Sequence, residues 1–343
     1  MSLTDTALPA CDAALGDVFP VATPVTHIAC LRDVCTVRLT PKYGSGATVA
    51  ASVHFTWHGA VGAPTVIVQG GISATRDVAR DGERPGWWEE FVRAHGPVDL
   101  ARVRVLSIDW LSAADLGGDV AGVSSEDQAD ALAALLDALG IRRAQAFIGA
   151  SYGAMVGLAF AARHAHRLGR LVAISGAHRA HPLATAVRAI QREIVRAGLR
   201  SGVTVPALSL ARQLAMTTYR GAEEFAERFD AEPEFRDGRF RFPVEDYLAH
   251  AGEKFVARFD ADRYLALSES IDLHRIDPAE VRVPALLIAI DSDRLVPVED
   301  FRDLAARLPH PVVLHEIPSR YGHDAFLKEF ARIGALIQPA LAC

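Results

Sequence analysis

The sequence predicts an α/β protein whose mostly parallel central sheet is flanked by helices and interrupted by an inserted helical lid. In the first half of the chain, short apolar runs alternate with stretches of helical periodicity. Strands that are buried on both faces give such continuous apolar runs, so the alternation indicates a parallel sheet covered by helices. About a hundred residues of helical pattern then precede two final apolar runs.

Each strand of the sheet is predicted from a local pattern. The stretch from Thr36 to Thr56 alternates apolar and polar residues, which indicates antiparallel strands at a sheet edge. The apolar runs that predict the remaining strands lie at residues 64–71, 103–110, 144–150, 170–176, 283–290 and 311–317.

Core helices are predicted at residues 125–139, from Gly153 to His164 and from Asp324 to Ile337. Ser124 or Ser125 supplies the N-cap of the first helix and Gly140 its stop. The predicted core comprises residues 1–177 and 278–343, and the lid comprises residues 178–277, with helical patterns at 186–199, 208–219 and 245–259. An insertion at this point covers the carboxyl edge of the sheet, where α/β proteins bind ligands.

Composition excludes several classes of function. The chain has 343 residues, 50% hydrophobic content and a net charge of −6, and no Lys/Arg run indicates nucleic-acid binding. The cysteines have neither CxxC nor zinc-ligand spacing, so we expect free thiols and no metal at Cys11, Cys30, Cys35 and Cys343.

Two further features concern the cellular compartment. The first 16 residues contain acidic side chains and no basic segment, which is unlike a secretory signal. The uncharged stretch from Ala144 to Ala162 is long enough to cross a membrane, but its glycines favour a strand, a tight turn and a helix. We therefore expect a cytoplasmic protein without a membrane partner.

The segment Gly149-Ala150-Ser151-Tyr152-Gly153 fits the pattern G-x-S-x-G. It follows a predicted strand and opens a predicted helix, which is the context of a nucleophile elbow. Such a sharp turn needs small flanking residues because strand and helix approach closely. Ser151 is therefore the candidate nucleophile, and a glycine-rich turn packed in the core is the alternative.

A serine hydroxyl needs a base, and the base needs an acid that orients it. Among thirteen histidines, His323 lies just after the last predicted strand, where this arrangement places the base. The acid is expected after the strand at 283–290. We predict Asp293, which lies further into that turn, and Asp291 remains the alternative. The predicted oxyanion donors are the backbone N–H groups of Tyr152 and Ile72, the latter in a loop that could also be an ordinary glycine turn.

Beyond the elbow, the sequence resembles the MetX-type homoserine O-acyltransferases of the α/β-hydrolase superfamily. The resemblance covers most of residues 64–335 and includes a Gly-Trp-Trp motif at 86–88. Lid segments RAIQREI (188–194), LARQLAMTTYR (210–220) and residues 244–274 look like family segments, as do DSDRLVPVED (291–300) and YGHDAFLKE (321–329).

The resemblance implies transfer of an acyl group from acyl-CoA to the hydroxyl of L-homoserine in methionine biosynthesis. It implies ping-pong kinetics through an acyl-Ser151 intermediate, with succinyl-CoA favoured over acetyl-CoA as donor. The expected partners are these small molecules alone, with no bound cofactor or metal, and a homodimer is expected. By matching position, Arg212 and Tyr219 become the substrate-binding pair. Arg212 would hold the homoserine carboxylate and Asp324 its ammonium group.

The sequence departs from the family at residues 108–122, where IDWLSAADLGGDVAG replaces a Gly/Cys-rich segment that ends in a GSTGP-like run. Tyr152 stands where many members carry methionine. Both departures border the expected acyl pocket and bear on the donor. A serine O-acyltransferase and a carboxylic-ester hydrolase with the same catalytic residues remain alternatives, as does a catalytically inactive binding protein.

Overall fold

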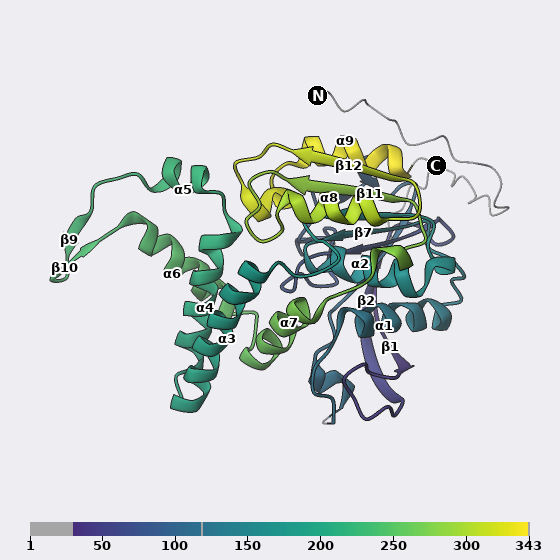
Figure 1. The fold of residues 1–343 in the computed structure, drawn as a ribbon, viewed down its shortest axis with the longest axis horizontal. Helices are drawn as coiled ribbons and strands as arrows, with labels where there is room; N and C mark the ends of the chain where they lie inside the picture. Colours follow the sequence, from purple (N-terminus) through teal and green to yellow (C-terminus); the bar gives the residue numbers. More distant parts are fainter. Residues whose placement is uncertain (1–29, 118, 342–343) are drawn as a thin grey trace.

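The computed structural model describes residues 30–117 and 119–341, which form an α/β core with a helical lid on one side (Figure 1). The core contains an eight-stranded sheet in the order β1-β2-β6-β3-β7-β8-β11-β12. Strand β2 is antiparallel to both of its neighbours, and the strands from β6 to β12 are parallel. The strands are β1 (Cys30–Leu39), β2 (Val49–His58), β3 (Thr65–Gln69), β6 (Arg104–Ile108), β7 (Ala146–Ala150), β8 (Leu171–Ile174), β11 (Ala285–Ile290) and β12 (Val312–Ile317). This topology confirms the predicted fold class.

Apolar side chains cover both faces of the sheet, which explains why its central strands are continuous apolar runs. Every residue of β7, β8 and β11 is buried. Helices α1 (Ser125–Ala138), α2 (Tyr152–Arg163) and α8 (Val298–Arg307) pack in the core cluster on one face. Helix α9 (Phe330–Leu341) packs with Trp88 and Phe91 in the second cluster.

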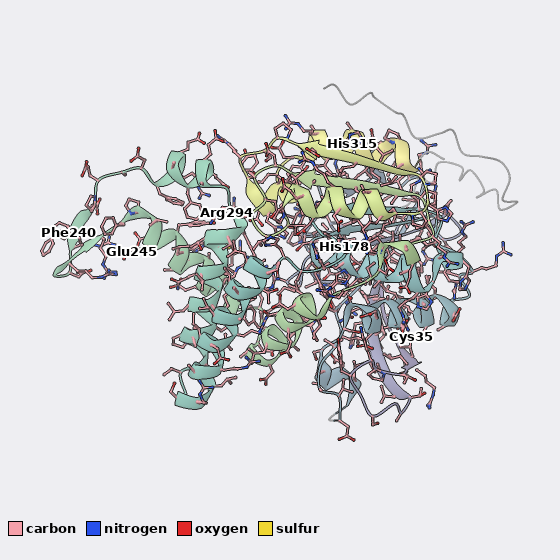
Figure 2. The ribbon with its side chains drawn as sticks, in the orientation of Figure 1. Cys35, His178, Phe240, Glu245, Arg294 and His315 are labelled. Carbon is pink, nitrogen blue, oxygen red and sulfur yellow. The ribbon has the colours of Figure 1, made fainter. Side chains whose placement is uncertain are left out.

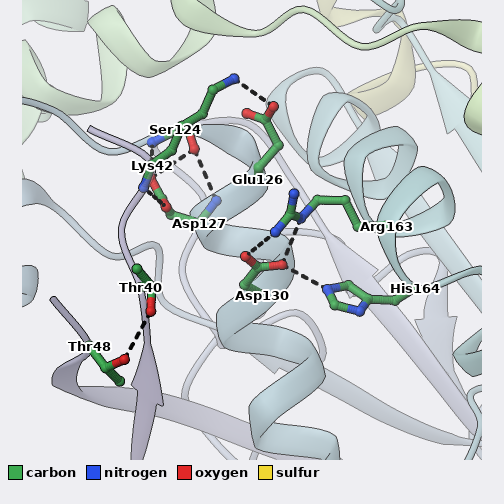
Figure 3. Close-up of polar contacts among 9 residues, drawn as sticks. All are labelled: Thr40, Lys42, Thr48, Ser124, Glu126, Asp127, Asp130, Arg163 and His164. Atoms are coloured by element: carbon green, nitrogen blue, oxygen red, sulfur yellow. Dashed lines mark hydrogen bonds and ion pairs between the residues drawn. The ribbon is translucent and has the colours of Figure 1, made fainter. Parts of the chain in front are cut away.

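Polar contacts fix α2 against α1 (Figure 3). Ser124 and Asp127 form a capping box at the start of α1, which satisfies its first N–H groups. On the same helix, Asp130 accepts two hydrogen bonds from Arg163, at 2.8 and 2.7 Å, and lies 2.8 Å from His164 Nε2. These contacts hold the carboxyl end of α2, and Ser151 directly precedes the amino end of the same helix.

In the sequence, the lid is inserted between β8 and β11, and the two ends of the insertion lie side by side. Arg179 and Arg275 form an isolated β-bridge, and the Ile276 amide donates to the His178 carbonyl at 3.0 Å. The lid contains α3 (Pro182–Ser201), α4 (Thr204–Tyr219), α5 (Ala222–Phe229), β9 (Glu234–Arg236), β10 (Arg239–Arg241), α6 (Pro243–Val256) and α7 (Ala261–Leu273). It has a small apolar core of its own. Figure 2 places Phe240 and Glu245 at its outer end.

Three details differ from the sequence expectations. The hairpin β9–β10 occupies a region where only helices are expected; it turns at Asp237-Gly238, whose positive φ values of 53° and 77° suit a tight hairpin turn. The last predicted helix is divided into the 3₁₀ helix η4 (Gly322–Leu327) and α9. A short sheet, β4 (Val92–Arg93) with β5 (Val98–Asp99), is an addition. The remaining 3₁₀ helices are η1 (Ala113–Leu116), η2 (Ala165–Arg167) and η3 (Pro278–Glu280).

No helix within residues 30–117 and 119–341 is long and apolar enough to cross a membrane. Cys30 and Cys35 are free thiols, whereas Cys11 and Cys343 lie outside the described residues.

Candidate active site

Ser151 occupies a strained turn between β7 and α2. Its φ of 56° and ψ of −121° lie in a region that residues with a side chain rarely adopt. The flanking glycines permit the turn because a Cβ at Gly149 would lie 2.2 Å from the Gly153 carbonyl oxygen. A Cβ at Gly153 would lie 2.2 Å from the Gln69 carbonyl oxygen. The strand, the helix and the neighbouring β3 therefore meet at a distance that only glycine allows.

The structure joins Ser151, His323 and Asp293 in one chain of hydrogen bonds. The Ser151 Oγ lies 2.8 Å from His323 Nε2, and His323 Nδ1 lies 2.7 Å from Asp293 Oδ2. The other carboxylate oxygen of Asp293 accepts from the amides of Leu295 and Val296, at 2.8 and 3.1 Å. These amides fix the carboxylate, so it can hold the imidazole in one orientation.

The Asp291 carboxylate binds the loop after β12 instead of the imidazole. Its Oδ1 accepts the Ser319 amide at 3.0 Å and thereby links the loops that follow β11 and β12. Asp293 is buried and contacts the imidazole, whereas Asp291 is exposed. Burial lowers the pKa of His323, but the adjacent Asp293 carboxylate and its hydrogen bond raise it, and the net pKa is above the ordinary value. The serine hydroxyl thus contacts a buried imidazole that a carboxylate holds in place.

The loop after β3 passes beside Ser151. A Cβ at Gly71 would lie 3.8 Å from Ser151 Oγ, and the Gly153 amide donates to the Gly70 carbonyl at 2.9 Å. Within the described part of the chain, the amides of Ile72 and Tyr152 donate no hydrogen bond. Tyr152 opens α2, so its N–H belongs to the free first turn of the helix. Both amides are thus available to an oxygen near Ser151.

The Tyr152 side chain links the elbow to the lid, a contact that the sequence alone did not predict. Its hydroxyl lies 2.5 Å from Ser270 Oγ on α7. The centre of its ring lies 4.9 Å from that of Trp110, in an edge-on arrangement. Trp110 Nε1 in turn donates to the Gly71 carbonyl at 3.0 Å. The elbow, the loop after β3 and α7 are therefore packed as one unit.

Arg212 and Tyr219 both lie on α4, and Tyr219 lies near the imidazole. The Arg212 guanidinium lies 5.1 Å from the Tyr219 ring centre and 5.0 Å from that of Phe255. The Tyr219 ring centre is 5.7 Å from that of His323. Arg212 has no acidic partner among the residues that the structure describes. Its charge is held by aromatic faces and remains available to an anion.

Asp324 is already paired with Arg220, a residue that sequence reasoning missed although it directly follows Tyr219. Arg220 Nε lies 3.1 Å from Asp324 Oδ2, and Arg220 Nη1 lies 2.7 Å from Glu224. Burial raises the pKa of Asp324, and the Arg220 charge opposes that rise. A ligand ammonium would therefore meet a carboxylate that is shared with Arg220.

Two cavities adjoin these groups. The small cavity, of about 30 Å³, is lined by Ser151, His323 and Tyr219, and by side chains of the lid. The large cavity, of about 620 Å³, does not reach Ser151 itself, but Asp324 and Arg212 line it beside residues 73–75, which follow Ile72. Tyr219 connects the two, since its ring contacts His323 on one side and Arg212 on the other.

Comparisons with known proteins agree with this geometry. Residues 64–330 match the model of the alpha/beta hydrolase fold. A homoserine O-succinyltransferase of Xanthomonas campestris pv. campestris is 53% identical over 285 residues, which cover 82% of this chain and 77% of the relative. A serine O-succinyltransferase of Litchfieldella anticariensis is 33% identical over 301 residues, which cover 75% of this chain and 82% of the relative.

A solved structure has the same fold. The homoserine O-acetyltransferase of Bacillus anthracis superposes with a TM-score of 0.82 over 92% of this chain and 98% of its own, at 16% identity. The family match, the sequence relatives and the elbow at the end of β7 lead to one conclusion: this chain belongs to the MetX-type homoserine O-acyltransferases of the α/β-hydrolase fold.

Proposed function

We propose that the protein is a cytoplasmic acyltransferase that moves an acyl group, preferably succinyl, from acyl-CoA to the hydroxyl of L-homoserine in methionine biosynthesis. One observation carries the proposal: Tyr219 links the hydrogen-bonded chain of Ser151, His323 and Asp293 to Arg212, which faces a large cavity and has no acidic partner among the described residues. The named activity of the 53% identical relative supports it. The homodimer that the resemblance implies stays a prediction, which a molar-mass measurement in solution would test.

The first half of the reaction acylates the serine. Ser151 Oγ attacks the thioester carbonyl while His323 Nε2 takes the hydroxyl proton. The carbonyl oxygen becomes negative and accepts hydrogen bonds from the free amides of Ile72 and Tyr152. The C–S bond then breaks, the CoA sulfur takes the proton from His323, and the acyl group remains as an ester on Ser151.

The second half reverses these roles. The homoserine hydroxyl gives its proton to His323 and attacks the ester carbonyl, and Ser151 leaves with that proton. Throughout, the Asp293 carboxylate stabilises the positive imidazole. The product is the O-acyl amino acid, and the enzyme returns to its starting state.

The acceptor distinguishes a transferase from a hydrolase. Arg212 offers a planar fork to a carboxylate, and Asp324 lies in the same cavity for an ammonium group. An esterase of neutral substrates has no use for this pair of charges. Serine is a closer rival, because it differs from homoserine by one methylene, a difference worth about 10- to 200-fold in a binding pocket.

The small cavity beside Ser151 favours a donor whose acyl group carries a negative charge. Arg188 lines this cavity and shares Asp272 with Arg192; each guanidinium lies 2.6 Å from a carboxylate oxygen. Two cations on one carboxylate leave one net positive charge. The Ser175 hydroxyl also lines the cavity, is buried, and has no partner among the described residues. A succinyl carboxylate can accept hydrogen bonds from an arginine and from a hydroxyl, whereas an acetyl methyl can accept none.

We therefore expect Arg188→Leu to lower the preference for succinyl-CoA over acetyl-CoA about tenfold. The substitution removes the charge-assisted contact between Arg188 and the succinyl carboxylate, and the effect is modest because Arg188 also pairs with Asp272. The measurement is the ratio of kcat/KM for the two donors with homoserine as acceptor. Arg196→Leu, which removes a half-exposed, ion-paired arginine from the same helix, is the matched control and should leave the ratio unchanged. An unchanged ratio in Arg188→Leu would contradict the assignment.

The proposed mechanism is tested by the covalent step. Mixing the enzyme with succinyl-CoA in the absence of an acceptor should add one succinyl group to Ser151, visible by mass spectrometry of the peptide that contains it. Steady-state kinetics should be ping-pong, with parallel double-reciprocal lines. Homoserine, but not water, should discharge the adduct rapidly. Intersecting lines with no adduct would rule out the acyl-enzyme, and rapid discharge by water alone would favour the hydrolase.

A further inference from the structure

We propose that the face of α6 in the large cavity binds the phosphate groups of the CoA donor, with Lys254 and Arg258 as the principal contacts. The proposal rests on the proposed function, because it assigns a subsite to the donor of that reaction. It is carried by the spacing of the residues on α6, the charges in the cavity and the position of the cavity relative to His323.

One stripe of α6 and the turn after it lines the cavity. The lining residues follow helical spacing i, i+3, i+4, i+7, i+8 and i+11, which places them on one face. They are Tyr247, His250, Ala251, Lys254, Phe255 and Arg258. At 1.5 Å per residue, the stripe runs for about 16 Å. The cavity is thus bounded along its length by one helix face whose last turn is cationic.

The positive charges of the cavity exceed the negative ones. Its lining includes five Lys and Arg residues and three aspartates. Each aspartate already has a partner: Asp109 accepts the Arg76 amide at 2.8 Å, Asp115 accepts the Ser112 amide at 2.7 Å, and Asp324 pairs with Arg220. Within the described residues, none of the three aspartates forms an ion pair with Lys254 or Arg258.

Lys254 and Arg258 have no acidic partner in the described part of the chain. Two other exposed cations of the lid do have one: Arg236 lies 3.7 Å from Asp246, and Arg239 lies 3.1 Å from Glu245. Unpaired cations on a cavity wall suit a phosphate, which accepts charge-assisted hydrogen bonds from both ammonium and guanidinium groups.

Arg263 connects this end of the cavity to the elbow. Its Nη2 donates to the Trp110 carbonyl at 2.7 Å, and Trp110 packs against Tyr152, the residue after the nucleophile. Elsewhere on the wall, Asp324 directly follows His323, and Ser73 directly follows Ile72. A long donor could thus place its thioester near Ser151 and its phosphates near Lys254 and Arg258.

The test compares two succinyl donors. Succinyl-CoA carries the phosphates, and the succinyl thioester of N-acetylcysteamine carries none. The double variant Lys254→Ala/Arg258→Ala should raise KM for succinyl-CoA about tenfold, a modest effect for two exposed contacts. It should leave kcat/KM for the phosphate-free thioester and KM for homoserine unchanged. Calorimetry should show a matching loss of affinity for CoA and for adenosine 3′,5′-bisphosphate, but little binding of inorganic phosphate to either protein.

Arg200→Ala removes an exposed lid cation outside the cavity and is the control; it should leave every constant unchanged. Arg258→Lys retains the charge and should keep most of the affinity for CoA. An equal loss for both thioesters, or unaltered CoA binding in the double variant, would overturn the proposal. If the wild-type protein transfers nothing to homoserine but the double variant still binds CoA more weakly, the phosphate site stands and the proposed function fails.

Discussion

Asp293→Asn is expected to lower kcat about ten-thousandfold, with KM for either substrate little changed. Asp293 Oδ2 accepts from His323 Nδ1 at 2.7 Å, so the imidazole presents an unprotonated Nε2 to Ser151. An asparagine amide in this place can donate to Nδ1 and favours the other tautomer, which leaves Nε2 protonated and unable to take the serine proton. The measurement is steady-state transfer from succinyl-CoA to homoserine.

Asp291→Asn is the matched control, because Asp291 lies two residues earlier in the same loop and its Oδ1 accepts the Ser319 amide rather than contacting the imidazole. An asparagine oxygen can accept the same hydrogen bond, so kcat should change less than about threefold. Both variants should retain the melting temperature of the wild type to within a few degrees. If Asp291→Asn proves the more damaging change, Asp293 is not the acid that orients the base.

The relative positions of Ser151, Asp293 and His323 could be predicted from sequence because each follows a strand of the parallel part of the sheet. These residues follow β7, β11 and β12, and the carboxyl ends of parallel strands lie at one edge. Apolar runs with glycine or polar stops identify such strands without knowledge of long-range contacts. Hence the sequence locates the loops, and the structure then shows which acid of the loop after β11 faces the imidazole.

Contacts between the lid and the core could not be predicted in this way. The Arg220–Asp324 pair joins residues that are 104 positions apart, and the Tyr152–Ser270 hydrogen bond joins residues 118 positions apart. Helical periodicity predicts the lid helices but not the direction in which each helix crosses the sheet edge. The hairpin β9–β10 was missed for another reason: its Asp-Gly turn is a recognised signal, but each of its strands has only three residues.

Arg212→Lys should lower kcat/KM for homoserine about 10- to 150-fold, the cost of a charged hydrogen bond worth about 1.5–3 kcal/mol. Lysine keeps the positive charge but loses the planar fork that binds a carboxylate through two parallel hydrogen bonds. It also loses the flat guanidinium that lies 5.1 Å from the Tyr219 ring centre and 5.0 Å from that of Phe255. A rigid, aromatic-packed cation would become a flexible one, so binding of the acceptor should weaken most.

The acylation half-reaction separates the two roles that Arg212 could have. Release of CoA in a single turnover without homoserine should be nearly unchanged in Arg212→Lys, because no acceptor is bound in that step. Arg200→Lys, on an exposed lid position, controls for the general effect of the substitution. If Arg212→Lys slows acylation as much as transfer to homoserine, Arg212 serves the donor or the fold. The large cavity would then have no established acceptor clamp, and a hydrolase that passes the acyl group to water would explain Ser151, His323 and Asp293 equally well.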